Sequence, residues 1–442
     1  MDLTTGQNLI KQKKFPEALK LFKNLLTLNP NKYDIYFYLG RVYSELQDFE
    51  SGIKFYKKYL EKNKNSIGCI LNLAILYLNI GDKKNSENNF RRLLGINRGY
   101  IYAYYGLFSL SKNHLKEEDL NYLANILNDN KISKRDRSLI NFIFSKKERE
   151  KNNLKKELNF LQQYHTLSFE NNATYNKQSL FYYERVLRNF HEKITFINST
   201  NNVYQKAQPI FVIGLPRSGS TLIESLISTN EKKIKSYGES NFFNIAIFDQ
   251  IRDKIFNKEY DADKTFFKID LSLVKKSINE RYDLNSYKEE DIVFIDKSLE
   301  NIFNIEVILK IFPNAKFIHT KRDIKDSILS IYFSMLPELS WTLSLKTIIN
   351  YIGLYQNTIS YYKKKFPERI FEVDLNELTS NSVKISQDVY KFCELNWNDQ
   401  ILNFYKRKDL FSKTISSSQI RKQISQTNQS KYDKYYFLLN KV

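Results

Sequence analysis

The sequence predicts a helical repeat solenoid followed by an α/β domain with a parallel sheet, and three observations lead to this prediction. Small and large apolar residues recur every 34 residues from residue 1 to about residue 110. From Pro209 onward, short apolar runs alternate with amphipathic helical patterns, as in layered α/β proteins. The first of these runs, Ile210–Ile213, leads directly into a glycine-containing loop and then into a helical pattern. A chain of 442 residues is long enough for both regions.

The first region carries a 34-residue repeat of small and large apolar residues. A helix pair needs a small residue where its helices touch and large apolar residues on the facing side. The recurring small positions are Gly6, Gly40 and Ala74, and the recurring large positions are Phe22, Tyr56 and Phe90. The pattern resembles the tetratricopeptide repeat. This resemblance implies a stack of helix pairs whose concave face holds a peptide or packs against the next domain. Both roles stay open on the sequence.

The next predicted region, residues 111–200, is an irregular helical extension with a linker. Two apolar faces, at residues 139–144 and 158–161, flank the charged run Lys146–Lys156, which is typical of a solvated helix surface or turn. The polar segment Asn198–Gln208 is expected to be the linker. The predicted domains are therefore residues 1–110, 111–200 and 201–442.

The third predicted domain alternates strands and helices. The expected strands are Ile210–Ile213, Lys235–Tyr237, Asp291–Ile295, Lys316–His319 and Ile370–Val373. The expected helices are Ser220–Thr229, Asn241–Phe256, Leu271–Tyr282, Asn301–Phe312, Ile324–Leu336, Thr342–Phe366 and Ser382–Glu394. Because such sheets bind ligands at the carboxyl ends of their strands, the residues after each strand are the candidates for a site.

Composition limits the classes of partner and the compartment. A net charge of +20 favours anionic partners, but Lys and Asn are over-used along the whole chain, so the charge alone indicates no particular partner. Neither a nucleic-acid partner nor a metal is expected. Cys69 and Cys393 lie far apart and form no metal or redox motif, and no signal peptide or membrane-spanning run is apparent. These observations favour the cytoplasm.

The loop Gly214–Thr221, called the glycine loop below, has the composition of an anion-binding turn. Its two glycines are spaced as in a Walker A loop, but Ser220 stands where the Walker lysine would be. The basic residue, Arg217, lies inside the loop instead. The sequence therefore predicts a phosphate-binding loop that is not built for the γ-phosphate of ATP. A tight turn with a solvated arginine is the alternative.

Polar and charged residues follow the other predicted strands. Glu239 comes after the second strand, Lys297 after the third and Arg322 after the fourth, with Ser330 eight residues further along. An arginine at a strand end and a serine two turns into the next helix can bind one phosphate together. With the glycine loop, this set resembles the sulfotransferases, which use 3′-phosphoadenosine-5′-phosphosulfate as the sulfuryl donor.

The resemblance implies a role for each of these residues. The glycine loop would hold the 5′-phosphosulfate, and Arg322 with Ser330 would hold the 3′-phosphate. A later segment, Thr414–Arg421, resembles the one that closes over the nucleotide. The implied nucleotide-binding residues are Pro216, Arg217, Ser218, Gly219, Ser220, Thr221, Leu222, Arg322, Ser330 and Arg421. The implied catalytic residues are Arg217, Glu239 and Lys297.

With the repeats in front, the whole chain is similar to bacterial tetratricopeptide-repeat sulfotransferases. Cations at Arg217 and Lys297 would stabilise charge on the leaving phosphate, and Glu239 would accept the proton of the acceptor hydroxyl. The expected acceptor is a protein tyrosine or a glycan, which the repeats help to hold. Ser220 in place of the usual threonine, and Ser298–Glu300 in place of a proline-containing run, depart from the family pattern.

Alternatives remain for single residues and for the whole chain. Glu239 could be only an acid near a helix N-terminus, and Arg322 could pair with Asp323 or Asp326. The chain could instead be a P-loop nucleotide kinase or a repeat scaffold with an inert nucleotide-binding domain. The absent Walker lysine argues against the kinase, and the joint presence of Arg217, Glu239 and Lys297 argues against the scaffold.

Overall fold

The structure is a computed structural model that describes residues 2–111, 114–198, 203–230, 234–257, 260–407, 420–424 and 431–441. The chain divides into two compact units, Met1–Ala173 and Thr174–Val442. The predicted extension, residues 111–200, straddles this division, because its last part belongs to the second unit. Within the described residues, every helix is too short or too polar to cross a lipid bilayer.

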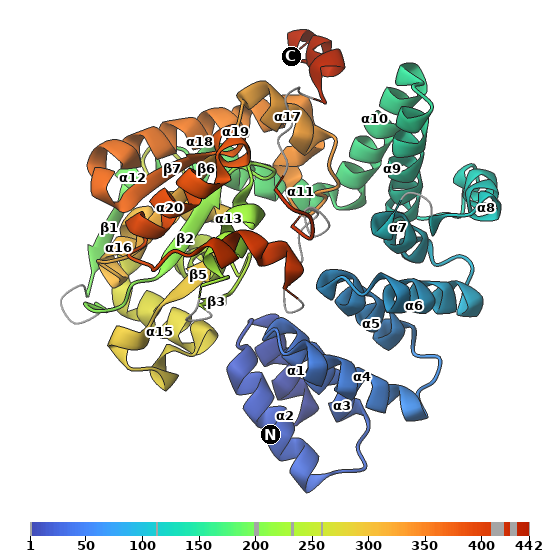
Figure 1. Cartoon of the computed structure of the whole chain (residues 1–442), viewed down its shortest axis with the longest axis horizontal. Helices are drawn as coiled ribbons and strands as arrows, with labels where there is room; N and C mark the ends of the chain where they lie inside the picture. Colours follow the sequence, from blue (N-terminus) through green and yellow to red (C-terminus); the bar gives the residue numbers. More distant parts are fainter. Residues whose placement is uncertain are drawn as a thin grey trace. The chain divides into compact units, whose positions relative to one another are not determined.

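The first unit consists of consecutive α-helices, as the repeat predicts (Figure 1). Its helices are α1 (Leu3–Lys11), α2 (Phe15–Leu28), α3 (Asp34–Glu45), α4 (Phe49–Lys62), α5 (Ile67–Ile80), α6 (Lys83–Ile96), α7 (Ile101–Leu110), α8 (Glu117–Leu127), α9 (Lys134–Glu150) and α10 (Leu154–Asn171). Aspartate side chains cap several of them. Asp48, for example, accepts the backbone N–H of Ser51 at the start of α4. Helices α9 and α10 form a hairpin and lie side by side (Figure 1).

The small residues of the repeat allow two helices to approach closely. A Cβ atom added at Gly40 on α3 would lie 2.6 Å from Cδ1 of Tyr56 on α4, which is too close for any side chain. In the next repeat Ala74 takes this position, and Ser86 Oγ donates a hydrogen bond of 2.9 Å to the Ala74 carbonyl. Tyr56 and Ala74 are both buried. The 34-residue pattern therefore records the contact between the two helices of each repeat.

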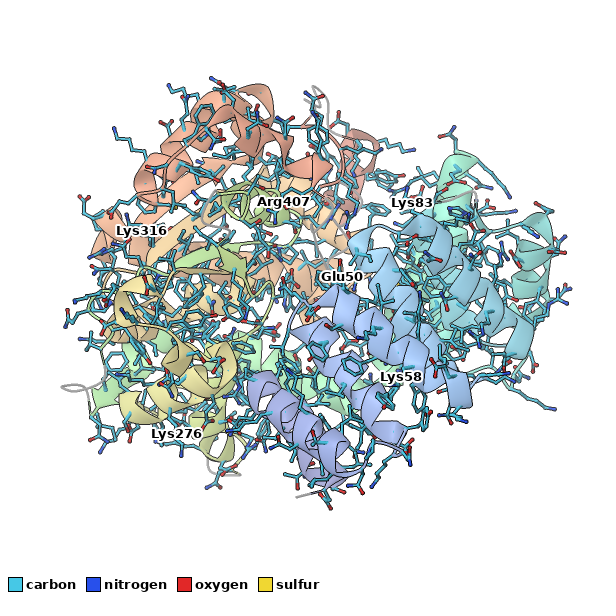
Figure 2. All side chains as sticks on the ribbon, turned by 60° about the horizontal axis from the view of Figure 1, so that its bottom comes forward. Glu50, Lys58, Lys83, Lys276, Lys316 and Arg407 are labelled. Atoms are coloured by element: carbon cyan, nitrogen blue, oxygen red, sulfur yellow. The ribbon has the colours of Figure 1, made fainter. Side chains whose placement is uncertain are left out.

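Basic side chains are spread over the surfaces of both units. Lys58 on α4 and Lys83 on α6 are exposed in the first unit, and Lys276 is exposed in the second (Figure 2). Glu50 is also exposed on α4 (Figure 2). The positive net charge is thus shared by both units, in line with the compositional bias of the whole chain.

The second unit is built on a parallel sheet, which in the described part of the chain has five strands in the order β3-β5-β2-β6-β7. These are β2 (Ile210–Gly214), β3 (Lys235–Ser236), β5 (Phe294–Asp296), β6 (Lys316–Lys321) and β7 (Ile370–Asp374). The chain starts at the central strand β2, continues to β3 and β5 on one side, and then crosses to β6 and β7 on the other. The carboxyl end of β2 is therefore the point at which ligands of such sheets bind.

Helices cover both faces of this sheet. The remaining α-helices are α11 (Ala173–Phe181), α12 (Phe190–Lys193), α13 (Ser220–Ile227), α14 (Phe242–Ile255), α15 (Leu271–Tyr282), α16 (Ile305–Ile311), α17 (Ile324–Tyr332), α18 (Leu345–Lys365), α19 (Leu375–Ser380) and α20 (Ser382–Phe392). Helices α14, α15, α16 and α18 pack in one apolar core, around Phe211 and Phe317 of the sheet. Helices α13, α19 and α20 pack in another, around Val212 and Ile318. Successive residues of β2 and β6 thus point to opposite cores, as expected for a buried strand.

The fold class is confirmed, while several predicted boundaries were wrong. Strand β5 begins at Phe294 rather than Asp291, because residues Glu289–Asp291 form a 3-10 turn. The predicted helix from Asn301 begins as the 3-10 segment Leu299–Asn304 before α16. Two short strands were missed: β1 (Ile194–Ile197) and β4 (Phe267–Asp270) pair with each other outside the main sheet. Their four-residue length gives little periodicity to detect.

Candidate functional site

The glycine loop joins β2 to α13 at the carboxyl edge of the sheet. Gly219 caps α13 with a φ of +96°, a left-handed conformation that favours glycine. A Cβ atom there would lie 2.7 Å from Leu375 Cδ1. In the described part of the chain no side chain caps this helix, so the N–H groups of its first turn are presented at the loop. This arrangement is suited to an anion.

The serines of the loop serve different purposes. Ser218 is buried, and its Oγ donates to the Leu215 carbonyl at 2.7 Å and lies 2.6 Å from Thr320 Oγ1 at the end of β6. Its hydroxyl therefore fixes the loop to the neighbouring strand. Ser220 and Thr221 are buried in the first turn of α13. Two further predicted nucleotide-binding residues, Pro216 of the loop and Leu222 of α13, are partly exposed.

Arg217 lies at the turn of the loop in a strained conformation. Its φ of +71° is uncommon for a residue with a side chain. Burial lowers the pKa of its guanidinium from the ordinary value, and the nearby charge of Arg322 lowers it further, while Tyr432 acts in the opposite direction. An arginine remains protonated even so. Two predicted anion-binding residues, Arg217 and Arg322, thus lie close enough to affect each other.

The structure brings Lys297 and Glu239 together, as the strand ends predicted. Lys297 Nζ donates to Glu239 Oε1 at 2.7 Å and lies 3.7 Å from Glu224 Oε2 on α13. The side chain of Lys297 is 1% exposed, whereas that of Glu239 is 49% exposed. The backbone N–H of Lys297 donates a hydrogen bond of 2.9 Å to the Gly238 carbonyl. A buried cation therefore faces a carboxylate that is open to incoming molecules.

Glu224 was missed by sequence analysis although it lies at the centre of this group. Burial raises its pKa, while Lys297 and the hydroxyl of Ser236 act in the opposite direction. Burial alone would lower the pKa of Lys297, but Glu239 and Glu224 outweigh it and raise that pKa. Lys297 is thus held in its charged form. Glu224 sits at the fifth position of α13, where an apolar core residue would otherwise be expected.

Asp296, the residue before Lys297, is fully buried and anchors the neighbouring loops. Its Oδ1 accepts the backbone N–H of Ser298 at 2.7 Å and the Asn301 amide at 3.0 Å. Its Oδ2 accepts the hydroxyls of Ser240 and Tyr282. Burial and the Asp296 carboxylate raise the pKa of the Tyr282 phenol well above its usual value, so Tyr282 donates. This network fixes the loop after β5 against the loop that carries Glu239.

Arg322 directly follows β6, and Ser330 lies on α17, the helix that comes next in the chain. Arg322 Nη2 pairs with Asp326 Oδ2 at 2.7 Å, which is the alternative contact that the sequence allowed. Ser330 Oγ accepts a hydrogen bond of 3.3 Å from the hydroxyl of Tyr432, and the Arg322 guanidinium lies 6.0 Å from the ring of the same tyrosine. Arg322 and Ser330 therefore converge around Tyr432, which sequence analysis did not consider.

The last predicted nucleotide-binding region is described only in part. Arg421 is partly exposed, and burial lowers the pKa of its guanidinium. Thr414–Gln419, the rest of the segment expected to close over a nucleotide, lies outside the described residues. A position for Arg421 in the site stays a prediction.

Family models match both regions of the chain. The model of the sulfotransferase family matches residues 209–399, and two models of the tetratricopeptide repeat match residues 9–68 and 68–100. An uncharacterized protein of Aquifex aeolicus is 26% identical over 333 residues, which are 74% of this chain and 43% of that protein. The chain thus spans less than half the length of this relative.

Solved structures similar to this chain include two sulfotransferases. One is the sulfotransferase domain from the curacin biosynthetic pathway, which is 14% identical and has a TM-score of 0.32, covering 52% of this chain and 89% of that one. The other, from Mycobacterium tuberculosis, is 11% identical with a TM-score of 0.29, covering 66% of this chain and 92% of that one.

Proposed function

Because residues 209–399 match the model of the sulfotransferase family, we propose that the chain transfers a sulfuryl group from 3′-phosphoadenosine-5′-phosphosulfate to a hydroxyl group. The observation that carries the proposal is the pairing of Lys297 with Glu239 at 2.7 Å, at the carboxyl edge of the sheet that holds the glycine loop. A cation for the leaving group and a base for the acceptor are thereby available at one place.

Sulfuryl transfer is an in-line displacement in which the acceptor oxygen bonds to sulfur while the bond between sulfur and the bridging phosphate oxygen breaks. Negative charge builds on that bridging oxygen, and adenosine 3′,5′-bisphosphate leaves. The acceptor hydroxyl loses its proton in the same process. The protein must therefore supply cations at the leaving oxygen, a base at the acceptor, and donors for the phosphate.

The residues of the site match these three needs. N–H groups at the start of α13 would bind the 5′-phosphosulfate, with Arg217 beside them. Lys297, which is held in its charged form, would stabilise the leaving oxygen. Glu239 would accept the acceptor's proton, and its partly exposed side chain is accessible to an incoming hydroxyl. No metal ion is needed for this division of roles.

The second end of the nucleotide would bind at Arg322 and Ser330. A guanidinium has five N–H donors, so its bond to Asp326 leaves others for a phosphate. The ion pair therefore fixes the orientation of Arg322 rather than excluding it from binding. Recognition of the 3′-phosphate at this point would distinguish the sulfuryl donor from ATP.

The acceptor is proposed to be a protein tyrosine or a glycan. The tetratricopeptide repeats are proposed to hold part of this acceptor, and the protein is proposed to act in the cytoplasm. Repeat stacks of this kind present an extended surface that is suited to peptides. Two alternatives differ from this proposal. A nucleotide kinase would prefer ATP, and a repeat scaffold with an inert nucleotide-binding domain would transfer no sulfuryl group.

Thermal unfolding with different nucleotides tests the proposal. We expect adenosine 3′,5′-bisphosphate to raise the melting temperature clearly more than ATP or ADP at the same concentration, because only the bisphosphate can satisfy Arg322 and Ser330. Equal shifts with bisphosphate and ATP would contradict the proposed donor and favour the kinase. The absence of any shift would contradict both the sulfotransferase and the kinase.

A further inference from the structure

The segment Lys431–Lys441 contacts the residues proposed to bind the 3′-phosphate. It contains the 3-10 helix Asp433–Lys441 and packs against α17, where Phe333 stacks on Tyr432 with ring centroids 5.9 Å apart. Building on the proposed function, we propose that this segment positions both residues of the 3′-phosphate pair, Ser330 through Tyr432 and Arg322 through Tyr436. Neither tyrosine takes part in the proposed sulfuryl transfer itself.

Tyr432 donates a hydrogen bond to Ser330. Both residues are buried, and the hydroxyl of Tyr432 lies 3.3 Å from Ser330 Oγ. A serine hydroxyl can accept one hydrogen bond while it donates another. When Tyr432 donates to Ser330 Oγ, the proton of Ser330 is turned away from Tyr432 and becomes available for a phosphate oxygen. Such a chain of hydroxyls also strengthens the outer hydrogen bond.

Tyr436 acts on Arg322 through Asp326. The hydroxyl of Tyr436 donates to Asp326 Oδ1 at 3.0 Å, while Asp326 Oδ2 accepts Nη2 of Arg322 at 2.7 Å. Asp326 is buried, and a buried carboxylate needs partners for both of its oxygens. By occupying Oδ1, Tyr436 leaves Oδ2 to hold the guanidinium in one orientation.

The spacing of the two contacts indicates one docking surface rather than two separate contacts. Asp326 and Ser330 are four residues apart on one face of α17, and Tyr432 and Tyr436 are also four residues apart. The pairs run in opposite directions, since Tyr432 contacts Ser330 and Tyr436 contacts Asp326. Tyr432 also influences the pKa of Arg217, so the segment lies within electrostatic range of the glycine loop.

The test is calorimetric binding of two nucleotides that differ only in the 3′-phosphate. Adenosine 3′,5′-bisphosphate and adenosine 5′-monophosphate are titrated into the full chain, and the ratio of their Kd values is compared. In the double variant Tyr432→Phe/Tyr436→Phe, the preference for the bisphosphate should fall about three- to tenfold, the net worth of about one hydrogen bond, because both lost contacts act on the phosphate indirectly. The Kd of the monophosphate should change less than about twofold, since positioning of the 3′-phosphate pair does not affect it.

Tyr204→Phe is the matched control. It removes a phenol hydroxyl that is bonded to Asn279 on α15, in the same unit but outside the proposed site, and it should keep the ratio of the parent. The inference is overturned if the double variant also keeps that ratio, or if it binds both nucleotides equally less well, as a merely structural role would predict. A tighter bisphosphate complex would overturn it too, because Tyr432 would then compete with the nucleotide. If the parent chain itself does not prefer the bisphosphate, the proposed function fails first.

Discussion

The two ends of the proposed nucleotide site are built in different ways. At the sulfate end, Glu239 and Lys297 come from loops that directly follow neighbouring strands. Ser236 of β3 lies opposite Ile295 of β5, so the residues that follow these strands meet a few positions later. At the 3′-phosphate end, Arg322 and Ser330 depend on Tyr432 and its segment, about a hundred positions away in sequence. Sheet register therefore brings the residues of the first end close together, and the Asp296 network then fixes their loops, whereas the second end needs a remote part of the chain.

The largest effect is expected at the sulfate end, from Glu239→Gln. This substitution keeps the size of the side chain and its hydrogen bonding but removes the base, so turnover should fall by roughly 10²–10⁴-fold. Binding of adenosine 3′,5′-bisphosphate should stay close to that of the parent. Single-turnover sulfation of the acceptor and calorimetry of the nucleotide measure the two quantities. Turnover at the parent rate would show that Glu239 is only a loop acid and that the base lies elsewhere.

A smaller effect is expected at the other end, from Arg322→Ala. Loss of a charge-assisted contact to the 3′-phosphate should weaken bisphosphate binding by about 1.5–3 kcal/mol. Calorimetric titration measures this loss. Adenosine 5′-monophosphate serves as the control ligand, because its affinity should hardly change. An unchanged Kd for the bisphosphate would mean that Arg322 serves only its ion pair with Asp326.

The smallest effect on nucleotide binding is expected from removal of residues 1–173. The described cation, base and loop residues of both ends belong to the second unit, Thr174–Val442. The shortened chain should therefore bind the bisphosphate within about twofold of the full chain, as distant, independent parts do, while its use of a macromolecular acceptor should decline. Circular dichroism checks that it folds. A folded but non-binding product would place the repeats in the wall of the nucleotide site.

Much of the fold and of the sulfate end could be predicted because both depend on local patterns. The 34-residue spacing of Gly6, Gly40 and Ala74 reflects helix contacts within each repeat, and the apolar run of β2 reflects burial on both faces. Lys297 and Glu239 were both expected at the carboxyl edge of the sheet, because parallel strands end at the same edge. The short strands β1 and β4 escaped detection because four residues carry too little periodicity.

The residues that sequence analysis missed share a physical reason. Glu224 lies in a largely apolar helix, and Asp296 is indistinguishable in sequence from a polar residue at a turn. Tyr432 and Tyr436 belong to a chain rich in tyrosine, so no local signal marks them. The two tyrosines matter through partners remote in sequence, which only the folded structure supplies. A polar residue within an apolar pattern, such as Glu224, is the one signal that could have been noticed.

The second carboxylate beside Lys297 has a consequence for engineering this site. Removing one partner of a buried ion pair usually leaves the other charge uncompensated, which costs several kcal/mol. Here Glu224 Oε2 lies 3.7 Å from Lys297 Nζ, so a neutral residue at position 239 would leave one carboxyl group beside the lysine. Glu224 is in effect a spare counter-ion. Position 239 can therefore be varied to alter reactivity without the usual penalty in stability, whereas position 297 has no such substitute among the described residues.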